Sequence, residues 1–390
     1  MSTRILRPLP VPPDNPAAIL PDLAEAISGN VTWLPVPAGR RREDRDRADL
    51  LIRSQRCGEP VNPEIAVVVC TSGSTGTPKG ALLTPGNLVS AADSTHSALS
   101  GEGYWLLAMP GHHIAGLQVL VRALVAGTEP ACLDVSAGFR TDDFTKLSHQ
   151  LTDAATADGL PVYTALVPLQ LAKALDTLAG IEALRRFNAI LIGGGHLPRH
   201  LRESCDRLGI RIVATYGSSE TTGGCVYDGQ PVPGTRVRIR DGRIHLGGPM
   251  IAVGYRTSPP GDDSFAEPGW FATRDRGEIT GGVLTVTGRL DDLIDSGGLK
   301  LHPGIIENAM LDINGIDSAC VVGIPHPRLG QAVVAAYTGT IEPWEVIEGL
   351  DDLPRWQLPK DVRHLTTMPL TGPGKPDRDA VRRLFTAPIR

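Results

Sequence analysis

The chain has 390 residues, of which 41% are hydrophobic and 21% charged, and its formal net charge is −5. This composition predicts a folded protein with a sizeable core, and the length suggests two domains. It excludes a largely disordered chain and, because no basic stripe is present, argues against a general nucleic-acid binder. No apolar stretch approaches the ~20 residues of a membrane-spanning helix, and no secretory signal is visible at the N-terminus.

The first sixty or so residues are rich in proline and charge. They predict one short helix over residues 21–28 and otherwise irregular structure. The arginine-rich run from Arg40 to Arg47 mixes both signs of charge, so we interpret it as a solvated surface segment rather than a partner site.

From residue 65 onward the pattern predicts an α/β unit. Short apolar, β-branched runs of the kind found in buried parallel strands occupy residues 65–70, 105–109, 189–192 and 210–215. Helical patterns at 117–126 and 169–178 lie between them, which predicts parallel βα units. Each run ends in a glycine- or hydroxyl-rich loop, and ligands usually bind at that end of such strands.

Beyond Val232 the sequence pattern predicts mainly β-strands, and after them a mixture of helices and strands. Alternating segments around Asp241-Gly242 and Gly281-Gly282 predict two β-hairpins. From Leu290 the sequence predicts a small α+β module with helices near 303–311 and 377–385 and strands at 318–324 and 332–337.

Six cysteines are scattered along the chain, and none forms a CxxC pair. We therefore expect neither a zinc ribbon nor a disulfide scaffold. Free thiols, buried or half-buried in a reducing cytoplasm, are the expected state.

The loop TSGSTGTPKG, which follows the first predicted buried strand, has the composition of a phosphate cradle. Its glycines allow backbone N–H groups to approach a ligand, its hydroxyls add donors, and Lys79 adds a positive charge. It is not a Walker loop, because Lys79 is followed by Gly80 rather than by serine or threonine. The alternative is a flexible surface loop.

Two carboxylates stand out at other strand ends. Glu220, among the hydroxyls of YGSSET, suits a Mg²⁺ ion that bridges phosphates, although a helix start capped by Ser218 or Ser219 is an equally plain interpretation. Asp275 in FATRD could accept hydrogen bonds from both ribose hydroxyls, but aspartate is also common in turns.

Two further features carry possible chemistry. The pair His112-His113 follows another strand, and we expect one of them to line a pocket rather than to bind a metal, because adjacent strand positions point to opposite faces. Lys375, in the glycine- and proline-rich stretch near the C-terminus, could move in to neutralise charge developing on a phosphate, or could be a plain surface lysine.

The order of these motifs resembles the signature of the adenylate-forming superfamily, which contains acyl-CoA synthetases, adenylation domains and luciferases. The stretches that carry the resemblance span roughly residues 65–385 and are TSGSTGTPKG, HHIAG, YGSSET, WFATRD, GRLDD, SGGLK and the late GK. Within the superfamily, the chain is most similar to the o-succinylbenzoate–CoA ligases of menaquinone biosynthesis in their short actinobacterial form. The stretches behind this closer resemblance are HHIAGLQVLVRALVAG, LDVSAGF, LIGGGHLP, YGSSETTGGCVYDG and PGWFATRD.

The resemblance implies a fold and a two-step reaction. The fold is a large α/β N-terminal domain (1–288), made of βα subdomains and a β-rich subdomain, a hinge (289–292) and a small, mobile α+β C-terminal domain (293–390). In the first step a carboxylic acid, here an aryl acid, attacks the α-phosphorus of ATP with the help of Mg²⁺ to give an acyl-adenylate and pyrophosphate. In the second step the thiol of CoA takes the acyl group and AMP leaves.

The resemblance also implies roles for individual residues. Lys375 would be the catalytic lysine of adenylation, Glu220 the magnesium ligand and His113 the gate between acyl pocket and thiol tunnel, while Asp291 would be the hinge and Gly297 and Gly298 would line the CoA channel. The residues implied to bind the ATP phosphates are Thr71, Ser72, Gly73, Ser74, Thr75, Gly76, Thr77 and Lys79. Those implied to bind the rest of the nucleotide are Gly193, Gly194, Gly195, Thr215, Tyr216, Gly217, Ser219, Asp275 and Arg289, and Gly194 and Tyr216 would also border the acyl group.

Some positions depart from the family pattern or leave choices open. Arg274 stands where relatives have glycine before the ribose aspartate, and the region before the phosphate loop is short, for which a homodimer could compensate. Arg122 is a candidate to hold a second, spectator carboxylate of the substrate, with an ordinary surface arginine as the alternative. A stand-alone enzyme that loads a carrier-protein thiol would carry the same motifs. A nucleotide-binding regulatory module is disfavoured, because it would not need both Glu220 and Lys375.

Overall fold

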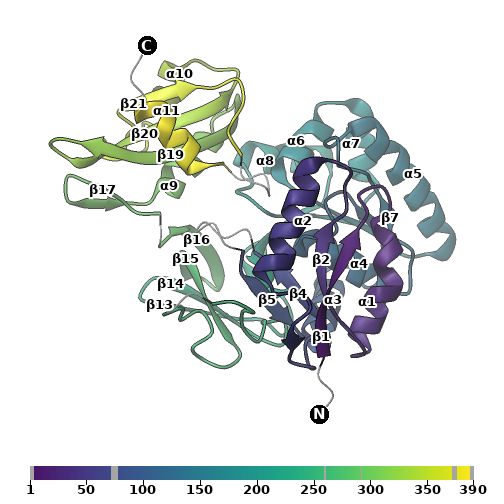
Figure 1. The fold of residues 1–390 in the computed structure, drawn as a ribbon. Helices are drawn as coiled ribbons and strands as arrows, with labels where there is room; N and C mark the ends of the chain where they lie inside the picture. Colours follow the sequence, from purple (N-terminus) through teal and green to yellow (C-terminus); the bar gives the residue numbers. More distant parts are fainter. Residues whose placement is uncertain (1–3, 72–77, 259–260, 291, 371–375, 387–390) are drawn as a thin grey trace.

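The computed structural model describes residues 4–71, 78–258, 261–290, 292–370 and 376–386 (Figure 1). A small sheet opens the chain, with strand order β3-β1-β2-β4-β5. Its strands are β1 (Arg4–Val11), β2 (Thr32–Pro37), β3 (Pro60–Val61), β4 (Val67–Cys70) and β5 (Gly80–Leu83), with η1 (Pro16–Ile19) and α1 (Leu20–Ile27) between β1 and β2. Strand β1 runs parallel to β2 and β2 to β4, whereas β5 is antiparallel to β4.

The expectation that most of the first sixty residues are irregular was therefore wrong. Prolines obscure the strand pattern of β1 and β2, but Leu6, Leu9 and Leu34 are buried in the core. The arginine run lies largely in helix α2 (Arg42–Ser54), which buries Leu51 against this sheet. Most of its arginines are nevertheless exposed, so the prediction of a solvated segment holds for the side chains.

The second sheet is the α/β unit that the sequence predicts. It has seven strands in the order β12-β11-β10-β9-β8-β6-β7, and the run from β10 to β7 is parallel. Its strands are β6 (Tyr104–Leu107), β7 (Ala131–Cys132), β8 (Val162–Leu166), β9 (Ala189–Ile192), β10 (Ile212–Ser218), β11 (Gly223–Tyr227) and β12 (Gln230–Pro231). Between β10 and β11 lies the short turn η2 (Ser219–Thr221).

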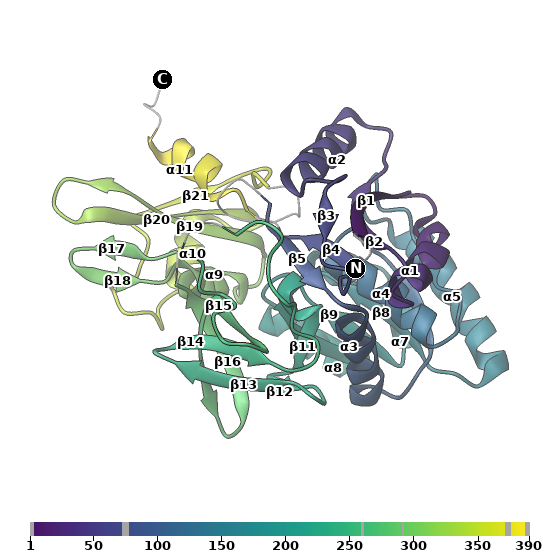
Figure 2. The ribbon, with the colours of Figure 1, turned by 60° about the horizontal axis from the view of Figure 1, so that its bottom comes forward.

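Helices cover both faces of this sheet (Figures 1 and 2). Helices α3 (Pro85–Ala98) and α4 (Ile114–Val125) share one hydrophobic core with the sheet, together with α1. The helices of the opposite face, which enclose a second core, are α5 (Thr141–Asp158), α6 (Pro168–Leu175), α7 (Leu178–Arg185) and α8 (Arg199–Leu208). Because helices cover both faces of the sheet, both sides of each parallel strand are buried. This explains why these strands are continuous apolar runs and do not alternate apolar with polar residues.

The β-rich part is a four-stranded antiparallel sheet, β13 (Arg236–Arg240), β14 (Arg243–Gly247), β15 (Trp270–Thr280) and β16 (Val283–Arg289). Both predicted hairpins are confirmed. The turn of the first is Asp241-Gly242, with φ values of 51° and 76°, and the turn of the second is Gly281-Gly282. Positive φ at both turn residues is what a two-residue hairpin loop requires, and it favours these residue types.

The C-terminal part is a small α+β unit beside β16 and α8 (Figure 1). Its elements are β17 (Ile294–Ser296), β18 (Leu299–Leu301), α9 (Pro303–Leu311), β19 (Ile316–His326), β20 (Gly330–Gly339), α10 (Pro343–Glu348), β21 (Asp361–His364) and α11 (Arg378–Thr386). Helix α9 packs on one face of its sheet and α11 on the other. The predicted fold class, a large α/β N-terminal part followed by a small α+β part, is confirmed.

All six cysteines are free, as expected from their spacing. Within the described part of the chain, no helix combines the length and the hydropathy needed to cross a membrane.

Candidate active site

Several of the predicted site residues lie at the ends of β4, β9 and β10 and on β15 of the β-rich sheet. The stem of the predicted phosphate loop is closed by a hydrogen bond from the Thr71 amide to the Lys79 carbonyl oxygen, 2.8 Å long. Several predicted residues lie outside the described part of the chain, namely Ser72, Gly73, Ser74, Thr75, Gly76, Thr77, Asp291 and Lys375.

Lys79, at the end of that loop, is engaged by residues that the sequence analysis did not single out. Its ammonium group forms an ion pair with Asp262 and lies 4.6 Å from the centroid of the Tyr255 ring. The side chains of Lys79 and Asp262 are only 14% and 4% exposed. Burial is the largest single influence and would raise the pKa of Asp262, but the hydrogen bonds from Lys79 and Ser264, together with the charge of Lys79, lower it overall.

Glu220 sits in η2 and is almost fully buried. Its Oε1 accepts a 2.5 Å hydrogen bond from the hydroxyl of Tyr255, and its backbone oxygen accepts one of 2.9 Å from the Ala252 amide. Burial, and then the neighbouring Glu220 carboxylate, raise the pKa of Tyr255, so its hydroxyl remains a donor at neutral pH.

As the alternative interpretation expected, Glu220 lies in the first turn of a short 3-10 helix that has Ser218 at its N-cap position. This helix has only three residues, and Thr222 alone separates it from β11. The Oγ of Ser218 has no hydrogen-bond partner within the described residues, so it caps nothing there. Ser219, the next residue before Glu220, is also buried.

The glycine loop after β9 lies against strand β10, and Gly217 of β10 lies against β11. A Cβ on Gly193 would lie 2.6 Å from the Thr215 hydroxyl, which itself donates to the Ile192 carbonyl oxygen at 3.2 Å. A Cβ on Gly217 would lie 2.1 Å from the Gly223 carbonyl oxygen. Gly194 has a φ of +82°, while a Cβ on Gly195 would meet open space. Glycine is therefore needed at 193 to leave room for the Thr215 hydroxyl and at 217 for the close approach of the Gly223 backbone.

Asp275 and two other predicted nucleotide residues meet at the edge of the β-rich sheet. The Tyr216 hydroxyl donates to Asp275 Oδ2 at 2.7 Å, and Arg289 Nη1 lies 3.4 Å from Oδ1. Burial, and then the Asp275 carboxylate, raise the pKa of Tyr216 well above its usual value. Arg274, which replaces the family's glycine, lies inside β15 and has no left-handed φ, so this position does not require glycine here.

His112 and His113 lie at the start of α4, with their ring centroids 4.2 Å apart. Burial, the largest cause in each case, lowers the pKa of His113 to about 4 and that of His112 to about 2, so both are neutral at physiological pH. His112 lines a small pocket of about 90 Å³ whose other walls come from the N-terminal region and from the segments after β6 and β7. The described residues contain no cluster of three or more His, Cys, Asp or Glu side chains suited to a metal.

Arg122 is not a surface residue. It is 3% exposed, its guanidinium lies 5.0 Å from the centroid of the Trp105 ring, and burial lowers its pKa. Among the described residues Arg122 forms no ion pair, and its Nε has no hydrogen-bond partner. The alternative that Arg122 is an ordinary surface arginine is therefore wrong. A buried cation without a counter-ion needs a ligand or water to offset the cost of its desolvation.

Two buried polar side chains near Arg122 were missed by the sequence analysis. His96 on α3 and Gln118 on α4 are 4% and 1% exposed, and the polar atoms of both side chains are unpaired among the described residues. The side chain of Gln118 lies close to Gly223 of β11, where an added Cβ would be 3.4 Å from it. The next residue, Gly224, pairs with Gly217 of β10. For Gln118 the sequence does carry a signal: Gln118 and Arg122 are two polar residues one turn apart in an otherwise apolar helix.

The burial of His96 gives a pH-dependent stability. Burial, and then Arg122, lower its pKa from 6.5 to about 4. A lowered pKa means that the unfolded chain binds the proton more readily, so this stability is complete above pH 6.5 and is lost as the pH falls toward 4. We expect His96→Gln to lessen the loss of unfolding free energy between pH 7 and pH 5 by about 2 kcal/mol. Denaturant titrations at both pH values measure this, with exposed His364→Gln as the control; equal losses in wild type and His96→Gln would contradict it.

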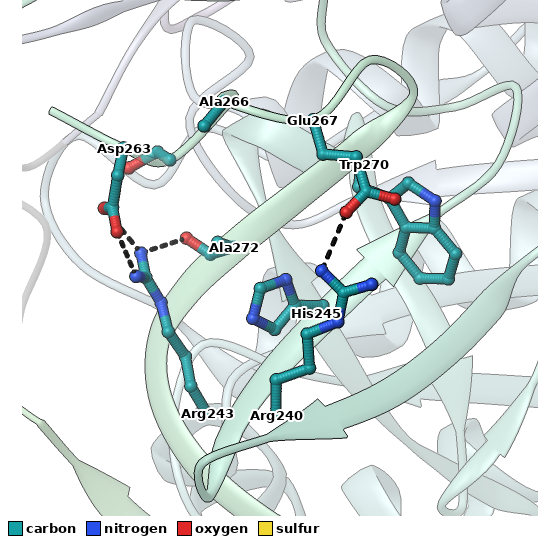
Figure 3. Close-up of a pocket in the computed structure, with 9 residues that line it drawn as sticks. Arg240, Arg243, His245, Asp263, Ala266, Glu267, Trp270 and Ala272 are labelled. Carbon is teal, nitrogen blue, oxygen red and sulfur yellow. Dashed lines mark hydrogen bonds and ion pairs between the residues drawn. The ribbon is translucent and has the colours of Figure 1, made fainter.

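The larger of the two pockets described, about 210 Å³, lies elsewhere (Figure 3). It is bordered by the β13–β14 hairpin and the loop before β15. The arginine and carboxylate side chains that line it are paired with one another. Arg243 donates two hydrogen bonds to Asp263, at 2.6 and 3.0 Å, and Arg240 donates one to Glu267 at 2.9 Å. None of the predicted nucleotide residues lines it.

The predicted CoA residues are on the C-terminal part. Gly297 and Gly298 form the turn between β17 and β18, with φ values of +65° and +80°. Figure 2 shows this hairpin at the outer edge of the C-terminal sheet, away from β9 and β11. The two parts touch where Asp312 Oδ1 accepts a hydrogen bond of 2.8 Å from the Arg199 amide. The glycine pair is therefore not at the candidate site in this arrangement.

Comparisons with known proteins identify the family of the chain. The family model "AMP-binding enzyme" matches residues 20–256, and "AMP-binding enzyme C-terminal domain" matches residues 305–375. A probable 2-succinylbenzoate–CoA ligase of Mycobacterium tuberculosis H37Rv is 41% identical over 97% of this chain and 98% of its own length. The 2-succinylbenzoate–CoA ligase of Escherichia coli K12 is 28% identical over 93% of this chain and 78% of its own.

Solved structures share the fold. ATP-bound MatB from Rhodopseudomonas palustris is similar with a TM-score of 0.79 and 21% identity, over 99% of this chain and 89% of that one. The o-succinylbenzoate CoA synthetase MenE from Bacillus subtilis, in complex with the acyl-adenylate OSB-AMP, gives a TM-score of 0.72 and 22% identity, over 96% and 82%. At these identities the likeness establishes the architecture.

Proposed function

The chain belongs to the family of AMP-binding enzymes, and from this premise we propose that it is an AMP-forming acid–CoA ligase that converts 2-succinylbenzoate to its CoA thioester through an acyl-adenylate. This reaction would give the protein a role in menaquinone biosynthesis. Near-complete coverage of a 2-succinylbenzoate–CoA ligase at 41% identity supports the substrate. The observation that carries the proposal is the hydrogen bond from Tyr216 to Asp275, with Glu220 buried in the turn that directly follows β10, the strand of Tyr216.

The first half-reaction makes a good leaving group. A free carboxylate is a poor acyl donor because oxide would have to leave, whereas AMP leaves readily from the mixed anhydride. The substrate carboxylate attacks the α-phosphorus and pyrophosphate departs. We assign the phosphates to the loop that begins at Thr71, and the ribose hydroxyls to Asp275, whose carboxylate is held by Tyr216 and Arg289.

Mg²⁺ fits the residues at Glu220. Oε2 of this nearly buried carboxylate accepts no hydrogen bond among the described residues, whereas Oε1 is held by Tyr255. A single protein carboxylate is the usual requirement for a magnesium ion bound mainly by phosphates and water. When bound, the ion would neutralise charge on the ATP phosphates. Glu220 would supply the ligand, and the buried turn around it would limit access of bulk water.

The second half-reaction needs access for a long thiol. The CoA sulfur attacks the acyl carbon, the acyl–phosphate bond breaks and AMP leaves. We propose that the C-terminal domain (293–390) rotates against the N-terminal domain (1–288) about residues 289–292, and so brings Gly297 and Gly298 from their outer position to the thiol channel. Neutral His113 at the start of α4 is proposed to border that channel.

The buried polar cluster of His96, Gln118 and Arg122 supports the choice of acid. 2-Succinylbenzoate carries one carboxylate that is activated and a second on the ring that is not. A guanidinium that is 3% exposed and forms no ion pair among the described residues is suited to that second carboxylate, since a charge-assisted hydrogen bond offsets the desolvation of both groups. We therefore propose that Arg122 selects for the dicarboxylate.

An exchange assay tests the proposal. Purified protein with ATP, Mg²⁺ and labelled pyrophosphate is screened over aromatic and aliphatic acids, and CoA is added in a second experiment. We expect 2-succinylbenzoate to support the fastest exchange and free CoA to give thioester and AMP. Rapid exchange without turnover of free CoA would point to a carrier-protein thiol as acceptor, and the lack of exchange with every acid would reject the proposal.

A further inference from the structure

Tyr255 is held beside the strand that follows the phosphate loop. The segment 253–256 pairs with β5: the Leu82 amide donates to the Gly254 oxygen at 2.9 Å, and the Arg256 amide to the Gly80 oxygen at 2.7 Å. This pairing places the Tyr255 hydroxyl 2.5 Å from Glu220 Oε1. A residue from a separate segment of the chain thus orients the carboxylate that we assign to Mg²⁺.

The ring of Tyr255 is fixed by two contacts. The ammonium group of Lys79 lies 4.6 Å from the ring centroid, and the Phe265 ring meets it edge-on with centroids 5.1 Å apart and an angle of 78°. Lys79 in turn forms an ion pair with Asp262, whose Oδ1 accepts a 3.0 Å hydrogen bond from the Ser264 amide. Because the charge of Lys79 is matched by a buried carboxylate, its position depends on Asp262.

The loop that presents Asp262 is anchored on its other side. Its residues Asp263 and Glu267 are held by Arg243 and Arg240 of the β13–β14 hairpin, as Figure 3 shows. A continuous set of contacts therefore runs from this hairpin through Asp262, Lys79 and Tyr255 to Glu220.

We propose that Tyr255 is a positioning residue for Glu220, and that the Lys79–Asp262 pair holds Tyr255 in place. This inference rests on the proposed function, in which Glu220 contacts a Mg²⁺ ion on ATP. The Tyr255 hydroxyl occupies Oε1 and thereby presents Oε2 to the ion. Partners of this kind, which hold a metal ligand without touching the metal, typically change metal affinity or activity about 10- to 100-fold when removed. Lys79 then stabilises the end of the loop instead of serving chiefly as a phosphate ligand.

Tyr255→Phe is the direct test, because it removes the hydroxyl and keeps the ring. We expect the Mg²⁺ concentration for half-maximal ATP binding, measured by calorimetry, and for half-maximal pyrophosphate exchange to rise about tenfold or more. Exchange at saturating Mg²⁺ should change much less, and metal-free AMP binding should be unchanged. The control is Tyr163→Phe, which loses a buried hydroxyl that bonds the Ser100 amide and the Gly101 oxygen, each at 3.0 Å, on a distant strand.

A second variant, Asp262→Asn, tests the support of Tyr255. Loss of the counter-charge of Lys79 should also raise the Mg²⁺ concentration needed, by a smaller factor than Tyr255→Phe does. Melting temperatures of all variants show whether each one is folded. The inference is overturned if Tyr255→Phe shifts the Mg²⁺ requirement no more than Tyr163→Phe, or if it weakens metal-free AMP binding equally. Wild type that binds ATP with Mg²⁺ but exchanges with no acid would reject the proposed function alone, and the binding assay would still decide the role of Tyr255.

Discussion

Lys375→Ala is expected to lower the rate of acyl-adenylate formation by about 10²–10³-fold, the cost of removing one donor that stabilises charge in a transition state. The reason is that the attack on the α-phosphorus builds charge on oxygens that we propose this lysine to contact. Thioester formation from a supplied acyl-adenylate should change only a few-fold, because no pyrophosphate leaves in that step. Pyrophosphate exchange measures the first step, and release of AMP from synthetic adenylate with CoA measures the second.

The control for this change is Lys360→Ala. Lys360 is an exposed lysine of the same C-terminal part, so its loss removes an equal charge away from the proposed chemistry. Both half-reactions should be close to wild type in this variant. If Lys375→Ala slowed both half-reactions by the same factor, its assignment to adenylation would be rejected.

Arg122→Met is expected to lower kcat/KM for 2-succinylbenzoate by about 10²–10³-fold, in line with the loss of one partner of a buried, hydrogen-bonded charge pair. The physical reason is that the ring carboxylate would be desolvated without a cation to receive it. The informative comparison is 4-oxo-4-phenylbutanoate, which has the activated carboxylate and lacks the one on the ring. Its kcat/KM should change little, so the preference of the wild type for the dicarboxylate should largely disappear.

Two outcomes would count against this role of Arg122. Equal losses for both acids would indicate general damage to the acyl pocket, and an unchanged preference would show that another group holds the ring carboxylate. Arg186→Met, which removes a half-exposed arginine paired with Asp153 at 3.1 Å, serves as the matched control and should alter neither acid.

Much of the fold follows from local patterns in the sequence. Continuous apolar runs that end in glycine- and hydroxyl-rich loops are typical of buried parallel strands, and they predicted β6, β9 and β10 and the loops after them. The pairs Asp241-Gly242 and Gly281-Gly282 predicted their hairpins because few other residues adopt positive φ twice in succession. The N-terminal strands escaped prediction since prolines break their alternation; β2 becomes a strand by pairing with β1 and β4.

The sequence by itself determined the order of motifs, and with it the superfamily, the fold class and the residues expected to meet ATP. Only the tertiary structure decided how those residues are supported. Tyr255 and Glu220 are 35 residues apart, and Asp262 and Lys79 are 183 apart, so no local pattern could pair them. Likewise a helical arginine looks the same in sequence whether it faces water or the core, and only the structure showed that Arg122 is buried beside the Trp105 ring. Burial and distant contacts depend on how the elements pack, which the spacing of residues along a chain does not record.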